Sequence, residues 1–304
     1  MTSSNCPLCG SSEIADAHSY PGEGKIFFPK EIANCGKCGL GRAIPMPDDQ
    51  QLNDYYNGDY WEASEINISA RKFPSPNVLG QSRWKHIEEH LKNQTNTTGL
   101  KLLDVGAGHG FLGLHAAKSK NVNVSGYHVV EPDKNLRDAL QTAWSAEDCI
   151  LTSCESLEKV DEKFDIIALC HVLEHVNDPL KFLNNITSKL NPGGLLFIEV
   201  PNRDDHFKSD VFPHTLFFDQ HSLPQTLNNA GLTNISCEIR GPSPEKSVLS
   251  DQPNVFRKKF SRRLFRLEKY LPVSLLTTYY NWLLAPEHKG QSGVWLRTIG
   301  FAPK

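Results

Sequence analysis

Residues 102–110 read Leu-Leu-Asp-Val-Gly-Ala-Gly-His-Gly, which combines an apolar beginning with three closely spaced glycines. The apolar first part, 102–105, predicts a short buried strand, and the helix-like pattern of residues 111–119 follows the glycines directly. Gly106 and Gly108 allow the backbone to pass close to a ligand, and the helix N-terminus beyond them offers unpaired amides. A strand, a glycine turn and a helix in this order predict the start of a nucleotide-binding unit.

The spacing of the glycines indicates which kind of nucleotide is bound. The dinucleotide fingerprint G-x-G-x-x-G needs a glycine at position 111, where this sequence has Phe111. A second predicted strand, 124–130, ends in Glu131, whose carboxylate stands where the two hydroxyls of a ribose can donate to it. We therefore expect no pyrophosphate at this site, with Glu131 as the ribose ligand and Asp133 as its rival.

The alternation of strands and helices continues along the chain. Hydrophobic patterns predict further strands at 164–170, 195–200, 233–240 and 293–301, and helices at 178–190 and 222–230. Strands that alternate with helices predict a parallel, doubly wound α/β sheet.

Two C-x-x-C motifs precede this unit, at Cys6 and Cys9 and at Cys35 and Cys38, with twenty-five residues between the two motifs. The sequence between them predicts a hairpin, with strands at 14–20 and 25–28 joined by the turn at 21–24. Four thiolates arranged in this way predict one tetrahedral Zn²⁺ in a zinc ribbon. Because such a site has no open position for water or substrate, we expect a structural ion, and a redox role for either motif is the weaker alternative.

The chain divides into three parts on this interpretation. We expect the zinc ribbon at 1–45, an aromatic-rich linker at 46–81, and the catalytic domain at 82–304 with an insertion at 241–290. The linker carries a dense group of rings, namely Tyr55, Tyr56, Tyr60 and Trp61. These rings either bury area at the domain junction or form a lid over the ligand.

Composition excludes several classes of function. The formal net charge is -3, with 39% hydrophobic and 22% charged residues, so no overall field attracts nucleic acid or anionic membrane. No apolar run reaches the length of a membrane span, and the N-terminus does not read as a secretory signal. Single cysteines scattered through the predicted strands suit a reducing compartment, and we expect a cytoplasmic protein.

These motifs together resemble the class I S-adenosylmethionine-dependent methyltransferases. The resemblance is carried by 102–110, by Glu-Pro-Asp at 131–133, by His-Val-Leu-Glu-His-Val-Asn-Asp-Pro at 171–179 and by Pro-Gly-Gly at 192–194. The N-terminal motifs more narrowly resemble zinc-ribbon methyltransferases related to sugar C-methyltransferases. The resemblance implies a Rossmann-like, mostly parallel seven-stranded sheet and the cofactors S-adenosylmethionine and structural Zn²⁺.

The resemblance also implies roles for individual residues. Asp104 orients the methionine amino group, Gly106 and Gly108 pass beneath the cofactor, and Glu131 holds the ribose hydroxyls. The loop 154–157 borders the adenine, with Glu155 as the contact within it. Cys170, at the end of the strand 164–170, completes the expected cofactor-binding set.

Acceptor chemistry points to histidines at the carboxyl ends of the strands. A hydroxyl or a carbon acid needs a base before it can accept a methyl group, whereas a carboxylate does not. His171 and His214 are the candidate catalytic residues because both follow predicted strands. His175 is expected to pack or cap a helix, and the rivals of the two candidates are Glu174, His206 and His221.

Residues 256–271 in the insertion read as a basic amphipathic helix. This helix either covers the catalytic domain, binds an anionic acceptor, or touches a membrane surface. The leading prediction is methyl transfer to a small-molecule acceptor such as a sugar or a nucleotide-linked sugar. The alternatives are a methyltransferase acting on protein or RNA, which the net acidity disfavours, and a non-catalytic cofactor-binding scaffold. The sequence makes no prediction about oligomeric state.

Overall fold

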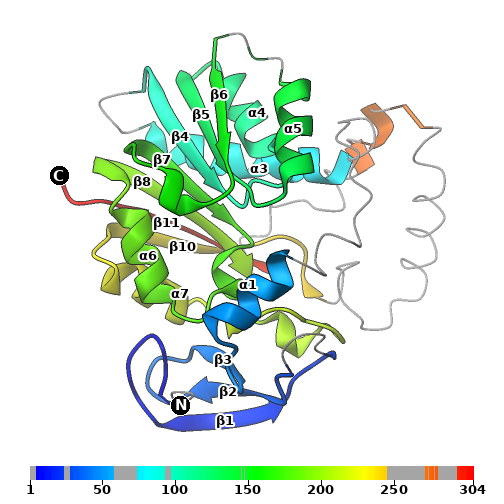
Figure 1. Ribbon diagram of the computed structural model, residues 1–304, viewed down its shortest axis with the longest axis vertical. Coiled ribbons are helices and arrows are strands. Elements are labelled where there is room, and N and C mark those ends of the chain that lie inside the picture. The colour runs from blue at the N-terminus through cyan, green and yellow to red at the C-terminus, as the bar shows by residue number, and fades with distance from the viewer. Residues whose placement is uncertain are drawn as a thin grey trace.

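The computed structural model describes residues 5–23, 28–57, 74–92, 97–144, 146, 148–244, 271–272, 274–276, 278–279 and 293–304. Within these residues the chain forms a seven-stranded sheet and a four-stranded sheet, seen at the centre and at the base of Figure 1. None of the helices in the described ranges is long and apolar enough to cross a membrane.

The seven-stranded sheet confirms the predicted Rossmann-like fold. Its strand order is β10-β11-β8-β7-β4-β5-β6. The five strands from β4 to β8 pair in parallel, whereas β11 is antiparallel to both β8 and β10. The bounds are β4 Leu100–Val105, β5 Val124–Val130, β6 Ile150–Cys154, β7 Phe164–Cys170, β8 Leu190–Pro201, β10 Thr233–Arg240 and β11 Trp295–Phe301.

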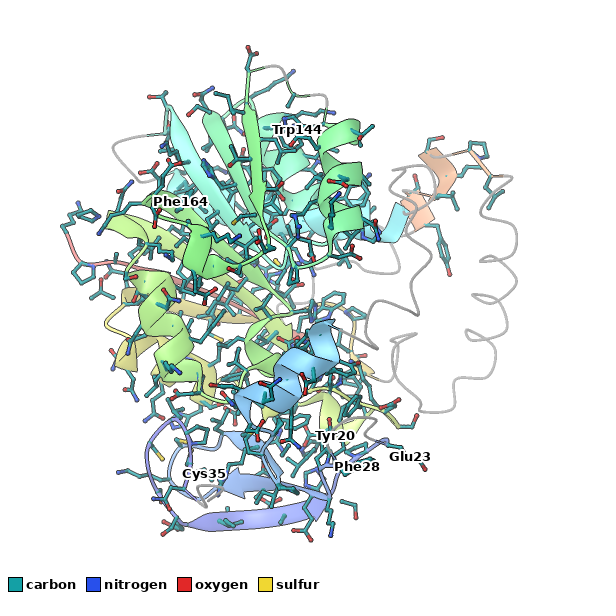
Figure 2. All side chains as sticks on the ribbon, viewed as in Figure 1. Tyr20, Glu23, Phe28, Cys35, Trp144 and Phe164 are labelled. Atoms are coloured by element: carbon teal, nitrogen blue, oxygen red, sulfur yellow. The ribbon has the colours of Figure 1, made fainter. Side chains whose placement is uncertain are left out.

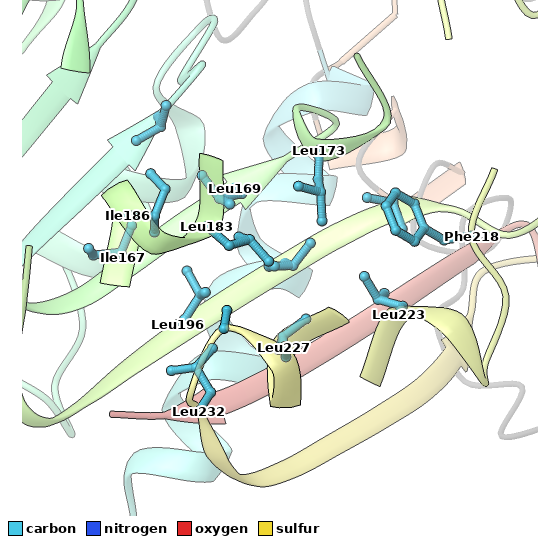
Figure 3. Close-up of a cluster of buried hydrophobic side chains, with 14 of the residues drawn as sticks. Ile167, Leu169, Leu173, Leu183, Ile186, Leu196, Phe218, Leu223, Leu227 and Leu232 are labelled. Carbon is cyan, nitrogen blue, oxygen red and sulfur yellow. The ribbon is translucent and has the colours of Figure 1, made fainter. Parts of the chain in front are cut away.

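Helices cover both faces of this sheet, which explains why its central strands are mostly apolar. One face packs against α3 (Pro74–Leu91), α4 (Phe111–Ala117) and α5 (Lys134–Ala143). The other packs against α6 (Pro179–Thr187) and α7 (Ser222–Asn229), where leucines of the two helices interdigitate with β7 and β8 (Figure 3).

The N-terminal ribbon departs from the predicted hairpin. Strand β1 (Ile14–Ser19) pairs with β2 (Glu31–Cys35), so the return strand lies later than the expected 25–28, of which 25–27 fall outside the described residues. Phe28 is described and belongs to no strand. The physical reason is burial, because Ile32 and Ala33 are fully buried whereas Phe28 is 64% exposed.

The ribbon also shares its sheet with the C-terminal part of the chain. Strand β3 (Gly41–Ile44) pairs with β2 on one side and with β9 (Leu216–Phe217) on the other. Sequence reasoning did not predict β9. Because of this pairing, the ribbon is docked on the larger unit by backbone hydrogen bonds as well as by side-chain packing.

The expected linker contains regular structure. Helix α1 (Asp49–Asn57) lies within it, and α3 begins in it at Pro74. Tyr55 is buried, with its ring centroid 5.2 Å from that of Phe212. Tyr60, Trp61 and residues 256–270 of the basic segment lie outside the described residues.

Gly113 offers a test of this packing. A Cβ at Gly113 would lie 2.1 Å from Cζ of Tyr127, whose ring is fully buried between α4 and β5. We expect Gly113→Ala to lower the free energy of unfolding by about 2 kcal/mol in urea denaturation, since overpacking a tight core has that cost. Gly126→Ala is the control, because its Cβ would meet its nearest atom at 3.5 Å. Equal stability of the two variants would contradict this account of the core.

Candidate functional site

The glycine turn follows β4 at the carboxyl edge of the sheet. Gly106 has a φ of +69° and Gly108 a φ of +51°, a backbone region that favours glycine. The amide of Gly106 donates to Val130 O at 2.7 Å, which ties the turn to the end of β5. A Cβ at Gly108 would meet no heavy atom of the described residues within 4 Å, so the turn leaves space on that side.

Glu131 lies at the end of β5 and faces this turn. It is 3% exposed, and its carboxylate accepts amide hydrogens from Gly108 at 2.9 Å and from Asp133 at 3.2 Å. Burial raises the pKa of Glu131 above its usual value, although these two amides oppose the shift. Each carboxylate oxygen keeps a further lone pair, so the group can still accept hydrogen bonds from a diol.

Asp133, the alternative ribose ligand, is the N-cap of helix α5. Its Oδ1 accepts the amide hydrogens of Asn135 at 2.7 Å and Leu136 at 3.3 Å and so caps helix α5. The geometry therefore favours Glu131 over Asp133 as the residue that faces a ligand.

Asp104 lies near the end of β4 and is 2% exposed. The hydroxyl of Tyr127, on the neighbouring strand β5, donates to its Oδ2 at 2.8 Å. Burial raises the pKa of Asp104 to about 7, against the opposing effects of Tyr127 and Arg83. This carboxyl group thus changes charge near neutral pH.

The other two expected cofactor residues lie at the ends of β6 and β7. Glu155 is exposed directly after β6, where it pairs with Lys159. Cys170 is half-buried at the end of β7, and burial raises the pKa of its thiol. The backbone at Cys154 is fixed, because Cys154 O accepts the amide hydrogen of Glu131 at 3.0 Å.

His171 follows β7 in a left-handed conformation with φ 57°, which is strained for a residue with a side chain. Its Nδ1 lies 3.0 Å from Oε1 of Glu174, and its Nε2 lies 3.4 Å from Oε1 of Glu199. Burial lowers the pKa of His171, but the two carboxylates raise it to about 9. His171 is therefore protonated at neutral pH and presents a cation rather than a base.

Behind His171 lies a buried ionic group that sequence reasoning missed. Glu199, on β8, is fully buried between Arg83 and Arg297, with Nε distances of 2.8 and 2.6 Å to its carboxylate. Burial opposes ionisation, but the two arginines and His171 hold the pKa of Glu199 well below its usual range. The only sequence signal was a glutamate in the middle of an apolar strand, which is rarely buried without a partner.

His214 and His175 meet beside Glu174 of the short 3-10 helix η2 (Leu173–His175). The ring centroids of the two histidines lie 4.9 Å apart. Nδ1 of His214 lies 3.2 Å from Oδ2 of Asp204, which belongs to the short helix η3 (Asp204–His206). The structure thus brings both candidate catalytic histidines, His171 and His214, together with His175 around Glu174. We refer to these three histidines as the histidine group.

The rival histidines lie elsewhere. His206 is exposed and lies 3.3 Å from Asp205, and His221 is exposed just before α7.

The four N-terminal cysteines converge as expected, with their sulfurs within 4.8 Å of one another. Cys6 Sγ lies 3.5 Å from Cys38 Sγ, and Cys9 Sγ lies 3.5 Å from Cys35 Sγ. A tetrahedral Zn²⁺ with bonds of about 2.3 Å needs sulfur separations of about 3.8 Å, so the cluster fits this ion. Burial raises the pKa of the Cys35 thiol, but the amides of Cys38 and Lys37 lower it to about 7.

The ribbon reaches the histidine group directly. The hydroxyl of Tyr20, which Figure 2 labels at the end of β1, donates to His214 O at 2.8 Å. The amide of Ala43, on β3, donates to Thr215 O at 2.9 Å. The ribbon therefore positions the backbone of residues 214 and 215, and no sequence motif indicated this contact.

Comparison with known proteins places the chain in a family. Residues 81–237, just over half of the chain, match the sequence profile of a family described as "Methyltransferase domain". A ubiquinone biosynthesis O-methyltransferase from Parvibaculum lavamentivorans is 37% identical over 109 residues, covering 34% of this chain and 41% of that protein. One from Coxiella burnetii is 30% identical over 158 residues, covering 51% and 61%. The match thus spans about half the length of these curated relatives.

Solved structures of similar shape are more distant in sequence. A phosphoethanolamine N-methyltransferase 2 from Haemonchus contortus, in complex with S-adenosyl-L-methionine, is 16% identical with a TM-score of 0.49, covering 83% of this chain and 60% of that one. An S-adenosylmethionine-dependent methyltransferase from Archaeoglobus fulgidus is 14% identical with a TM-score of 0.48, covering 80% and 100%. Family membership therefore rests on the sequence profile.

The pKa of Asp104 predicts a pH dependence of stability. A carboxyl group whose pKa rises from 3.8 to about 7 on folding destabilises the native state progressively as the pH rises from about 4 to 7, and by a constant amount above that. Asp104→Asn removes this dependence and keeps an acceptor for Tyr127. We expect the stability of the variant relative to wild type to increase between pH 5 and pH 8 in urea unfolding without ligand. A relative stability independent of pH would contradict the assigned shift.

Proposed function

The chain belongs to the methyltransferase domain family, and on this premise we propose that it transfers the methyl group of S-adenosylmethionine to a small-molecule acceptor. The observation that carries the proposal is the pairing of the glycine turn with Glu131. Gly108 donates to Glu131 at the carboxyl edge of the sheet, where open parallel sheets bind ligands. Glu131 accepts the ribose hydroxyls, and Gly106 and Gly108 pass beneath the cofactor.

The residues around this edge contact different parts of the cofactor. Asp104 lies nearest the methionine end and orients its amino group, while the loop containing Glu155 borders the adenine. Cys170 lies at the end of β7, the strand next to β4, and contributes to the cofactor wall. The cofactor supplies a sulfonium methyl group, which is reactive without further activation. The protein therefore has to hold the acceptor about 3 to 3.5 Å from the methyl carbon and exclude water.

His171 and His214 stand on the acceptor side. The turn that leads to them abuts the glycine turn, because a Cβ at Gly106 would lie 2.7 Å from Cγ2 of Val172. His171, whose two ring nitrogens face Glu174 and Glu199, places a fixed positive charge on the acceptor side. His214 activates the acceptor, and the packing of Tyr56 against His175 supports the interpretation of helix α1 as part of a lid.

We further propose that the acceptor is methylated on oxygen. The curated relatives bear the name O-methyltransferase. A hydroxyl acceptor has to lose a proton, and the histidine group can assist that proton transfer. A sugar or nucleotide-linked sugar is the narrower form of this proposal, and it rests on the resemblance of the N-terminal motifs to sugar methyltransferase relatives. The ribbon, with structural Zn²⁺ on its four cysteines, shapes the acceptor side through Tyr20.

Calorimetric titration of S-adenosylhomocysteine tests the cofactor site. We expect Glu131→Ala to weaken binding by about 100-fold, because two hydrogen bonds to a charged group are lost. Glu158→Ala is the matched control, since Glu158 is exposed on the neighbouring turn. Equal affinity of Glu131→Ala and wild type would remove Glu131 from the ribose site.

Metal analysis tests the ribbon. We expect one tightly held zinc per chain, lost in the double variant Cys35→Ser and Cys38→Ser and kept in Cys149→Ser. Because β3 pairs with β9, loss of the ion should cost about 3 kcal/mol or more and lower the melting temperature by at least about 6 °C. An unchanged melting temperature in the double variant would contradict the structural role.

A further inference from the structure

Two buried ligand atoms beside the cofactor edge lack partners. Glu174 Oε2 and His175 Nδ1 are buried and form no hydrogen bond with any described residue, whereas His214 Nδ1, close to them, pairs with Asp204 Oδ2 at 3.2 Å. Leaving such atoms unpaired is unfavourable, and two of them in one place require an explanation. Each of the three residues also offers a ligand atom within 4.8 Å of those of the other two.

From this convergence we infer that Glu174, His175 and His214 bind a divalent cation distinct from the zinc of the ribbon. Two imidazoles and one carboxylate suit a first-row ion such as Zn²⁺, Fe²⁺ or Co²⁺. Bonds of about 2.1 Å need ligand separations of about 3.4 Å, so the ligand atoms, now within 4.8 Å of one another, approach by up to about 1.4 Å on binding the ion. Three protein ligands leave coordination positions open for an acceptor oxygen.

The backbone holds the three ligands in place without an ion. Glu174 O accepts the amide hydrogen of Thr215 at 2.8 Å and its hydroxyl hydrogen at 3.1 Å, which joins η2 to the segment that carries His214. The fully buried side chain of Leu173 anchors η2 in the hydrophobic cluster (Figure 3). Tyr20 fixes the carbonyl of His214 from the ribbon side. The site is thus preorganised by hydrogen bonds that do not involve the ligand atoms.

Glu174 is also oriented from outside the site. It is 1% exposed, and its Oε1 lies 3.0 Å from Nδ1 of His171, which leaves Oε2 for the ion. Outer contacts of this kind orient metal ligands in proteins. His171 in turn lies 3.4 Å from Glu199, which pairs with Arg83 and Arg297. The two arginines therefore help to orient Glu174 indirectly, through Glu199 and His171.

The cation would activate the acceptor for methyl transfer, and this part of the inference rests on the proposed function. An acceptor hydroxyl bound to the ion loses its proton to water at neutral pH. Its oxygen then forms a bond to the methyl carbon while the sulfur–methyl bond breaks and the electron pair stays on sulfur, which yields S-adenosylhomocysteine. His214 thus activates the acceptor through the ion, and the acceptor class is a compound with an ionisable hydroxyl.

Cobalt binding tests the site with the full-length, zinc-loaded protein. We expect calorimetry to find one equivalent of Co²⁺ beyond the ribbon zinc, with visible d–d absorption and without the thiolate charge-transfer bands of a cysteine site. Glu174→Gln, His175→Gln and His214→Gln should each weaken Co²⁺ binding by about 100-fold or more, because even the loss of an outer partner costs about 10- to 100-fold. His221→Gln is the control and should bind Co²⁺ as wild type does.

Titration of S-adenosylhomocysteine on the same samples separates this inference from the proposed function and shows that each variant is folded. Wild type that binds the nucleoside but takes up no second ion overturns the cation site and leaves the proposed function standing. Wild type that binds Co²⁺ but not the nucleoside supports the cation site and overturns the proposed function. Glutamine variants that keep wild-type Co²⁺ affinity also overturn the assigned ligands.

Discussion

The parallel pairing of β4 with both β5 and β7 is the constraint on which the site depends. This pairing brings three chain segments, each leaving the carboxyl end of its strand, to one edge of the sheet. The glycine turn, Glu131 and His171 are the first residues of those segments. Apolar burial on both faces of the sheet stabilises this strand pairing. The same pairing that forms the hydrophobic core therefore also positions the residues of the candidate site.

A second constraint is the continuity of the ribbon with the larger unit. Cys6, Leu8 and Leu40 belong to the same hydrophobic cluster as the leucines of α6 and α7. Strand β3 extends its pairing to β9, and Ala43 and Tyr20 bond to the backbone of residues 214 and 215. The ribbon therefore forms part of the wall around the histidine group.

The sequence predicted what depends on local pattern and left undetermined what depends on long-range contact. Residues 102–105 and 164–170 are apolar apart from one aspartate each, and both are strands, because burial on both faces favours such runs. The return strand of the ribbon was placed too early, since a turn signal at 21–24 does not determine how long the turn is. The second sheet contact at β9 has only two residues and no periodic signal. The charge of His171 depends on Glu174 and Glu199, and the second of these lies on another strand.

We propose that the glycine turn and Glu131 hold the nucleoside of the methyl donor with its sulfur toward the histidine group. A crystal structure with S-adenosylhomocysteine tests this most directly. We expect both ribose hydroxyls within hydrogen-bonding distance of Glu131, with the sulfur facing the side of the turn where His171 and His214 lie. A nucleoside bound elsewhere, or a sulfur directed away from these histidines, would contradict it.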